Sequence, residues 1–185
     1  MVVVAITDFS RLDLDGHIAA YTRLERRYPD GQLSIQVRIP GAPAAEVRRC
    51  AQGLQSLGLP LFVNGQPDVA RELGTGLHLG SRRGSLADAR AIVGPEARIS
   101  VACHDEAEAV AARVEGASFV VVSPIFDVPG KGPPLGLIGL RRLVEVAGAL
   151  PVVALGGIDE ASWPAVRDAG AVGFAAIRAF LIDPG

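Results

Sequence analysis

The sequence predicts an α/β fold, a compact (β/α)8 TIM barrel that forms a single domain over residues 1–185. Eight short β-branched runs recur along the chain, and segments with helical spacing separate them. The runs are continuously apolar, which is typical of parallel strands buried on both faces. No GxGxxG motif follows the first run, so a doubly wound open sheet is the weaker alternative. Because 185 residues are few for such a barrel, we expect short loops and a shortened C-terminal helix.

The predicted strands are rich in Val, Ile, Leu and Phe. Gly, Pro or charged residues bound them, as expected for strands that end in turns. They cover residues 2–7, 33–39, 59–64, 76–79, 97–103, 118–126, 150–157 and 171–178.

The predicted helices have apolar residues at spacings of three and four, which places these residues on one helix face. They include residues 44–58, 67–74, 86–94, 105–116, 139–149 and 159–170. Several end at Gly, which tolerates the left-handed conformation of a helix C-terminus. Asp105 and Asp159 stand where N-terminal caps belong.

Composition narrows the class of protein. Hydrophobic residues make up 49% of the chain and charged residues 21%, which is ample for one sizeable core. The net charge of -2 and the lack of basic runs argue against a nucleic-acid partner. No apolar stretch approaches the roughly 18 residues that cross a bilayer, so we expect no membrane partner. The chain opens on a strand-like run rather than a signal peptide, and two cysteines without metal-ligand spacing indicate a reduced, cytoplasmic setting.

Functional residues of a barrel gather where strands end at the C-terminal face, and that rule selects the candidate residues. They are Asp8, Gln36, Arg38, Asn64, His78, Arg82, Arg83, His104, Lys131, Gly156, Gly157 and Arg178.

The loops after the seventh and eighth strands predict a phosphate site. Gly156 and Gly157 come before a helix, and Ile177 and Arg178 close the last strand. Exposed backbone N–H groups and a helix N-terminus favour an anion at this place. The alternative is a simple turn that needs glycine for its backbone angles.

Three histidines differ in their expected roles. His104 follows the fifth strand and can exchange protons near neutral pH, although it could instead cap the next helix. His78 sits at an apolar strand end and is expected to be packed and hydrogen-bonded. His17 follows DLDG in the first crossover and is expected on the surface.

Most of the remaining candidates are cations. Gln36 and Arg38 alternate with apolar residues on the second strand, and we expect both to point inward near the barrel mouth. Lys131 stands in the longest irregular loop, where it is either an anion clamp or a solubilising charge. Arg82 and Arg83 lie in GLHLGSRRGS, where they either meet an anion or belong to a solvated loop.

Seven stretches, in order over nearly the whole chain, resemble thiamine phosphate synthase and its TenI-type relatives. They are ITD (6–8), IQVR (35–38), LPLFVNG (59–65), DVARELGTGLHLG (68–80), SVACHDEAEA (100–109), SPIFDVPGKGPPLGLIGLRRL (123–143) and ALGGID (154–159). The resemblance implies a (β/α)8 barrel. It also implies that synthase members join a pyrimidine diphosphate to a thiazole phosphate, with Mg²⁺ escorting the diphosphate.

The chain departs from the synthase pattern at five positions. Pro40 stands for a Lys, Gly65 and Arg83 for the two magnesium-binding Asp residues, Ala102 for a Ser and Val128 for a Thr. Mg²⁺ needs hard carboxylate oxygens, so Gly65 and Arg83 in place of the two Asp residues argue against a metal site. The pattern is matched at Gln36, Arg38, Asn64, His78, His104, Lys131, Gly156 and Gly157.

The resemblance therefore favours the TenI-type branch, whose VNG pattern the chain shares at 63–65. The prediction is a metal-independent isomerase, a thiazole carboxylate phosphate tautomerase with His104 as acid and base and no cofactor. Its partner would be a small-molecule thiazole phosphate ligand, and family members suggest a homo-oligomer. Two alternatives stay open: a thiamine phosphate synthase with a degenerate magnesium site, and a non-catalytic phosphate-binding or regulatory barrel.

Overall fold

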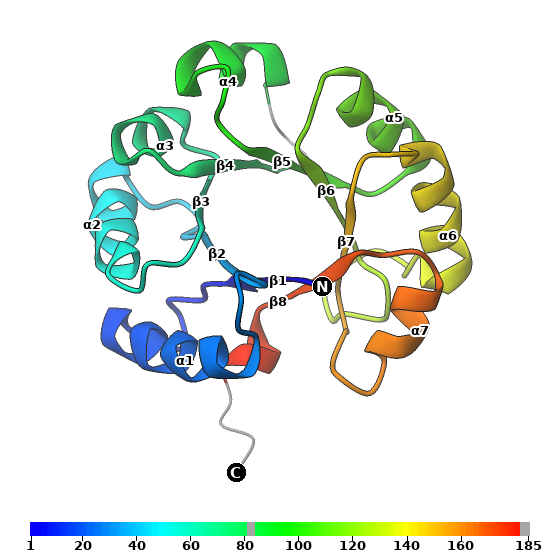
Figure 1. Cartoon of the computed structure of the whole chain (residues 1–185), viewed down its shortest axis with the longest axis horizontal. Helices are drawn as coiled ribbons and strands as arrows, with labels where there is room; N and C mark the ends of the chain where they lie inside the picture. Colours follow the sequence, from blue (N-terminus) through cyan, green and yellow to red (C-terminus); the bar gives the residue numbers. More distant parts are fainter. Residues whose placement is uncertain (81–83, 182–185) are drawn as a thin grey trace.

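The computed structural model describes residues 1–80 and 84–181 and confirms the predicted barrel. Eight parallel strands close on themselves in sequence order, and helices form a ring outside them (Figure 1). The strands are β1 (Val2–Ile6), β2 (Leu33–Val37), β3 (Leu61–Asn64), β4 (Gly76–Leu79), β5 (Ile99–Cys103), β6 (Phe119–Val122), β7 (Val152–Leu155) and β8 (Gly173–Ala176). Each lies inside its predicted range, and most are shorter because the flanking residues belong to loops.

The helices cover the outside of the barrel, one after each strand from β1 to β7. They are α1 (Leu14–Arg27), α2 (Ala44–Gln55), α3 (Pro67–Leu73), α4 (Leu86–Val93), α5 (Glu106–Val114), α6 (Gly136–Ala147) and α7 (Trp163–Asp168). Gly74 and Gly94 end α3 and α4, as the sequence indicates, and Gly148 ends α6 just inside its predicted range of 139–149. No helix in the described ranges is long and apolar enough to cross a membrane.

Among the residues described after β8, one 3₁₀ turn, η1 (Arg178–Phe180), stands in place of a full helix, in agreement with the expected shortened helix. Its Phe180 ring packs edge-on against Tyr28, with ring centroids 6.2 Å apart. Phe180 also lies 5.7 Å from Phe174 of β8. These aromatic contacts fasten η1 to the residue that ends α1, so the last turn of chain covers the outside of β8.

Strand register decides which side chains face the inside of the barrel. Residues paired across parallel strands point to the same face. Seven buried side chains form a cluster separate from the layer between strands and helices: Val4, Ile6, Phe62, Phe119, Val121, Val153 and Ala175. Ile6 pairs with Gln36, and Gln36 pairs with Phe62. Gln36 therefore points into the barrel, as predicted.

An aromatic pair closes the end of the barrel at which the strands begin. Phe62 and Phe119 pack edge to face with ring centroids 5.3 Å apart, and the Arg98 guanidinium lies 5.4 Å from the centre of the Phe62 ring. A Cβ atom at Gly76 would lie 2.4 Å from the Phe62 ring, so glycine is required there. Because side chains of the described residues fill this end, we expect a ligand to enter from the end at which the strands finish.

Two expectations about local structure are wrong. His17 is fully buried on α1 rather than exposed, because backbone groups satisfy both of its ring nitrogens. Asp159 does not cap a helix, since α7 begins at Trp163 and Ser162 precedes it. The Asp159 carboxylate instead accepts hydrogen bonds from the Ser162 backbone and hydroxyl in a tight turn. Asp105 does cap α5, where its carboxylate accepts from the Glu108 N–H at 2.8 Å.

Candidate functional site

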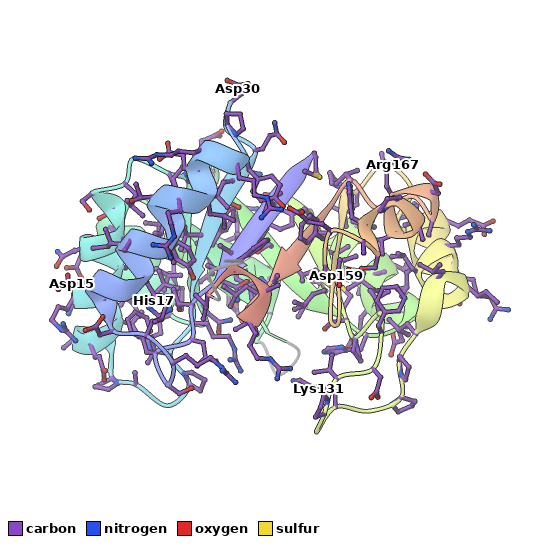
Figure 2. All side chains as sticks on the ribbon, turned by 90° about the horizontal axis from the view of Figure 1, so that it is seen from below. Asp15, His17, Asp30, Lys131, Asp159 and Arg167 are labelled. Carbon is purple, nitrogen blue, oxygen red and sulfur yellow. The ribbon has the colours of Figure 1, made fainter. Side chains whose placement is uncertain are left out.

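The open end of the barrel carries most of the candidate residues. Figure 2 shows Lys131, on the loop after β6, at the opposite end of the molecule from Asp30, which precedes β2. A cavity of about 280 Å³ lies at this end, between the loops that follow β2 and β3. Its lining residues are Arg38, Ile39, Pro40, Gly41, Ala42, Asn64, Gly65 and Gln66. Two of the positions that depart from the synthase pattern, Pro40 and Gly65, therefore border the cavity.

Arg38 supplies the positive charge of this cavity. It stands one residue beyond β2, and its side chain is exposed to solvent at the cavity wall. The Thr7 hydroxyl holds its backbone from both sides, accepting from the Arg38 N–H at 2.9 Å and donating to the Arg38 carbonyl at 3.1 Å. A fixed backbone and a free guanidinium suit the recognition of an anion.

Two amides complete the polar lining of the cavity. Asn64 is half-buried at the end of β3, next to Gly65. Gln66 donates from Nε2 to the Ala42 carbonyl at 3.2 Å. Its Oε1 atom is buried and has no hydrogen-bond partner among the described residues. A buried acceptor is costly when unpaired, so Gln66 can accept a hydrogen bond from a ligand or a water that enters the cavity.

His78 lies beneath the mouth, inside the barrel. It pairs with Asn64 and Ser100 across the neighbouring strands, and its Nδ1 is 2.9 Å from the Ser100 hydroxyl. Burial, helped by the positive charge of Arg38, lowers the pKa of His78 to about 4. The side chain is therefore neutral at neutral pH and is packed and hydrogen-bonded, as the sequence indicates.

His104 stands at the rim, immediately after β5, and is exposed. Its Nδ1 lies 2.5 Å from the Ser123 carbonyl. A carbonyl only accepts hydrogen bonds, so Nδ1 carries the proton in this contact and Nε2 keeps a lone pair. The His104 backbone N–H donates to Glu108. Ala102, two residues earlier, pairs with inward-facing Val121 and brings no hydroxyl to the histidine.

Close packing explains why the two positions after β7 are occupied by glycine. A Cβ atom on Gly156 would lie 2.9 Å from the Pro124 Cα, and one on Gly157 would lie 2.8 Å from the Phe126 Cβ. The Gly156 carbonyl accepts from the Phe126 N–H at 3.0 Å. Both glycines thus allow the loop after β6 to pack against the loop after β7. The helix that should follow begins only at Trp163, so the expected helix N-terminus is not adjacent to them.

The other predicted residues are spread around the rim. Ile177 is half-buried and Arg178 is exposed, where β8 passes into η1. Lys131 is exposed, and its N–H donates to the Val128 carbonyl in a turn of the loop after β6. Arg82 and Arg83 lie outside the described residues.

Three residues of this end were missed by sequence reasoning: Thr7, Gln66 and Ser100. Thr7 and Ser100 are buried polar residues in apolar strands or directly after them. Each is the hydrogen-bond partner of a predicted site residue, Arg38 or His78. A hydroxyl within an apolar strand was the available signal, because a buried hydroxyl needs a partner.

Comparisons with known proteins agree with the fold and identify relatives. A family model described as thiamine monophosphate synthase matches residues 4–180. A thiamine-phosphate synthase of Methylococcus capsulatus is 36% identical over 177 residues, covering 91% of this chain and 77% of the relative. One of a Roseiflexus species is 37% identical over 162 residues, covering 83% and 68%. The solved thiamine phosphate pyrophosphorylase of Pyrococcus furiosus superposes with a TM-score of 0.84 at 28% identity, covering 99% of this chain and 88% of that one.

These relatives contradict the tautomerase prediction. The curated relatives that match most of the chain are named synthases, which are transferases rather than isomerases. The TenI-type prediction rested on a few positions, chiefly Gly65 and Arg83 in place of the magnesium-binding Asp residues, whereas Ala102 departs from both branches of the family. Sequence identities of 36 to 37% to named synthases, over 83 to 91% of the chain, outweigh these few positions.

Proposed function

The chain belongs to the thiamine monophosphate synthase family, and on that premise we propose that it is a thiamine-phosphate synthase, a transferase that joins a pyrimidine diphosphate to a thiazole phosphate. The observation that carries the proposal is the match to named synthases over most of the chain. The product keeps one phosphate, so the reaction must release diphosphate. The residues that bind this leaving group are therefore the ones to identify.

Arg38 is the first candidate to bind the diphosphate. It lines the 280 Å³ cavity, and a guanidinium makes two parallel hydrogen bonds to a phosphate. Lys131 stands on an exposed loop at the same end and supplies a second positive charge. As the bond to carbon breaks, negative charge grows on the departing oxygen, and positive charges already in place stabilise it.

The pyrimidine ring would lie deeper, against the amides. Asn64 and Gln66 offer hydrogen-bonding groups at the cavity wall, and Gln36 faces the barrel interior below them. Ring nitrogens accept hydrogen bonds, so the amide N–H groups of Asn64 and Gln36 suit them, whereas the unpaired Gln66 Oε1 would accept from an N–H of the ligand. The low pKa of His78 leaves the floor of the site uncharged, and a neutral floor suits a heterocycle better than a buried charge does.

The thiazole phosphate would enter from the other side of the mouth. Its phosphate would meet backbone N–H groups of Gly156, Gly157, Ile177 and Arg178 in the loops after β7 and β8, the usual place in this fold. The exposed His104 would contact the thiazole through Nε2, since Nδ1 is bonded to Ser123. We infer each of these placements from where the residue lies on the rim of the barrel.

The residues present do not fit a carboxylate-bound magnesium ion. Gly65 has no side chain to offer, and the second magnesium-binding position is Arg83. Within the described ranges no three His, Cys, Asp or Glu side chains gather where they could hold a metal ion. Any magnesium would be bound by the diphosphate rather than by side-chain carboxylates, and the chain itself would offer the diphosphate cationic side chains.

A coupling assay tests the proposal. The purified protein is incubated with the pyrimidine diphosphate and the thiazole phosphate, with and without added magnesium, and thiamine phosphate and diphosphate are quantified. We expect both products in equal amounts. Arg38→Gln should raise the KM for the pyrimidine diphosphate, whereas Arg49→Gln, on the exposed side of α2, should not. Absence of thiamine phosphate under every condition would exclude synthase activity and leave a ligand-binding barrel.

Two further predictions accompany this function. A homo-oligomer is expected, and apolar side chains on α5 and α6 lie open to solvent, with Val114 77% and Ile138 72% exposed. Light scattering on the purified protein measures the oligomeric state directly. The cytoplasm is the expected compartment, because the chain has only two cysteines and they lack metal-ligand spacing, which suits a reducing setting.

A further inference from the structure

His17 is a buried histidine that the proposed reaction does not use. It lies in the first turn of α1 and is 0% exposed. Its ring packs between Phe9, at a centroid distance of 4.5 Å, and Tyr21, at 5.6 Å. A polar ring in such a place needs two hydrogen-bond partners, and their nature defines what the ring can do.

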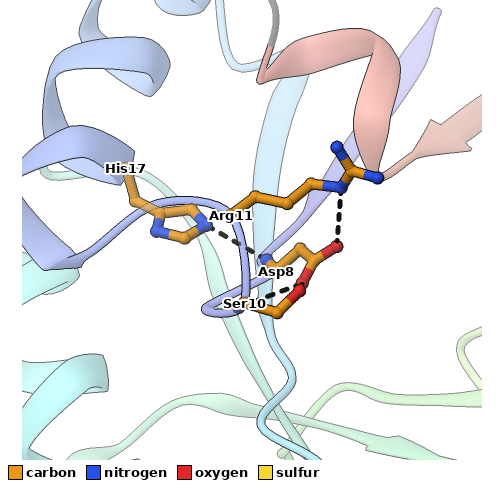
Figure 3. Close-up of polar contacts among 4 residues, drawn as sticks. All are labelled: Asp8, Ser10, Arg11 and His17. Atoms are coloured by element: carbon orange, nitrogen blue, oxygen red, sulfur yellow. Dashed lines mark hydrogen bonds and ion pairs between the residues drawn. The ribbon is translucent and has the colours of Figure 1, made fainter.

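Both partners of His17 are backbone groups at the two ends of the loop after β1. Nδ1 lies 2.8 Å from the Asp13 carbonyl, and the Asp8 N–H points at Nε2 from 3.0 Å (Figure 3). A carbonyl only accepts and an N–H only donates, so Nδ1 must carry the proton and Nε2 must be bare. Only this neutral tautomer satisfies both groups.

The surroundings favour the neutral ring. Burial lowers the pKa of His17, although the hydrogen bond to Asp13 and the charges of Asp8 and Asp13 oppose this effect. The Asp8 carboxylate is occupied elsewhere: Oδ1 accepts from the Ser10 N–H and hydroxyl, and Oδ2 lies 3.4 Å from Arg11 Nε (Figure 3). Asp8 thus meets His17 through its backbone, and its carboxylate organises the rest of the loop.

Asp8 is linked to the cavity through its neighbour Thr7, which bonds to the cavity residue Arg38. Thr7 precedes Asp8, and its hydroxyl brackets the Arg38 backbone, accepting from the N–H and donating to the carbonyl. The Thr7 N–H in turn donates to the Gln36 carbonyl at 3.0 Å. A fixed Asp8 backbone therefore holds Thr7 in place. Thr7 in turn sets the position of the Arg38 backbone, from which the guanidinium side chain extends.

We propose that His17 is a positioning residue for Arg38: its neutral Nδ1–H ring ties the end of β1 to the start of α1 and so holds Thr7 against the Arg38 backbone. The inference rests on the proposed function only for the identity of the anion that Arg38 binds. His17 touches no substrate. Its effect passes through Asp8 and Thr7 to Arg38, which contacts the anion.

A matched pair of variants separates this role from simple packing. His17→Gln and His17→Asn both lose the ring and its aromatic contacts. The glutamine amide can reach the place of Nε2 and accept from the Asp8 N–H, whereas the asparagine amide reaches only the place of Nδ1 and bonds to Asp13. A merely structural role predicts equal effects, or a larger effect for glutamine. Positioning predicts that asparagine is the worse variant and that glutamine rescues.

Inorganic diphosphate is the binding probe, because its use does not depend on turnover. We expect His17→Asn to weaken diphosphate binding by about fivefold, the worth of roughly one lost hydrogen bond, with His17→Gln close to the wild type. In the coupling assay the same change should appear in the KM for the pyrimidine diphosphate, with kcat little changed. Hydrogen exchange of the Arg38 amide should quicken in His17→Asn and return in His17→Gln.

Two more measurements keep the test decisive if a His17 variant fails to fold. Nitrogen NMR of the wild type should show His17 protonated at Nδ1 and bare at Nε2. Thr7→Val, which keeps the side-chain shape without the hydroxyl, should weaken diphosphate binding as His17→Asn does. An Nε2–H tautomer, equal diphosphate affinities in the two His17 variants, or unchanged affinity in Thr7→Val would each overturn the proposal. If the wild type forms no thiamine phosphate, the proposed function fails, while diphosphate affinity and Arg38 exchange still decide the role of His17.

Discussion

Lowering the pH from about 7.5 to about 5 tests whether the barrel holds His78 neutral. The pKa of His78 is about 4, because the side chain is buried and Arg38 disfavours a second positive charge nearby. In the unfolded chain the ordinary value is about 6.5. A difference of about 2.5 between the two pKa values corresponds to about 3 kcal/mol when it is fully developed.

The direction follows from which state binds the proton. Because the folded pKa is depressed, the unfolded chain takes up the proton first, and the free energy of unfolding falls as the pH drops below about 6.5. At about pH 5 the unfolded histidine is charged and His78 in the folded barrel is still mostly neutral. About 2 kcal/mol of stability should be lost at that pH on account of His78 alone.

Urea denaturation of the wild type and of His78→Asn at both pH values isolates this contribution. Asparagine keeps a polar group near the Ser100 hydroxyl, 2.9 Å from Nδ1 in the wild type, but it does not titrate. The variant should therefore lose about 2 kcal/mol less than the wild type between the two pH values. Arg49→Gln, on the exposed side of α2, is the control and should follow the wild type. An equal loss in wild type and His78→Asn would refute the reasoning.

Three other changes have defined outcomes. Arg38→Gln removes the positive charge that helps to depress the pKa of His78, so NMR titration should show that pKa rising above about 4 while burial keeps it below 6.5. Gly173→Ala would place a Cβ 1.9 Å from a backbone oxygen of β1, whereas Gly132→Ala meets nothing within 4 Å. Thermal unfolding should therefore show a loss of about 2 kcal/mol or more in the first and little change in the second. Asp105→Ala removes the α5 cap and should cost about 1 kcal/mol in urea denaturation; an unchanged midpoint would contradict the cap.

The strands were predictable because a parallel sheet covered by helices leaves a plain signal. Runs such as 118–126 and 150–157 are apolar on both faces, and β6 and β7 lie within them. The ends of the strands were less predictable, since apolar loop residues such as Ile125 continue the run while their backbone has already left the sheet. Ile125 still bonds to the Leu155 carbonyl at 3.0 Å, beyond the end of β6.

The first helix shows why polar residues mislead. The buried face of α1 consists of His17, Ala20, Tyr21 and Leu24, at helical spacing. Counting His17 as polar removes the first member of that stripe and predicts a surface residue. The ring is buried because the loop returns two backbone groups to it. The path of that loop from Asp8 to Asp13 is irregular, and no periodic pattern in the sequence indicates it.

The residues of the site also divide into those that the sequence could place and those that it could not. Gln36, Arg38, Asn64 and His78 could be placed from the alternation of strands, and β2, β3 and β4 bring them to the same end of the barrel. Thr7, which holds Arg38, could not, because its hydrogen bonds join strands 31 residues apart in the sequence. The branch of the family also could not be decided from the few positions at which the chain departs from the synthase pattern.

A crystal structure of the protein with the pyrimidine diphosphate bound tests the central claim most directly. The account predicts that the diphosphate lies within about 3 Å of the Arg38 guanidinium and that the ring faces Asn64 and Gln66 in the cavity between the loops after β2 and β3. A diphosphate seated away from that cavity, or one held through a magnesium ion on side-chain carboxylates with Arg38 turned outward, would contradict it.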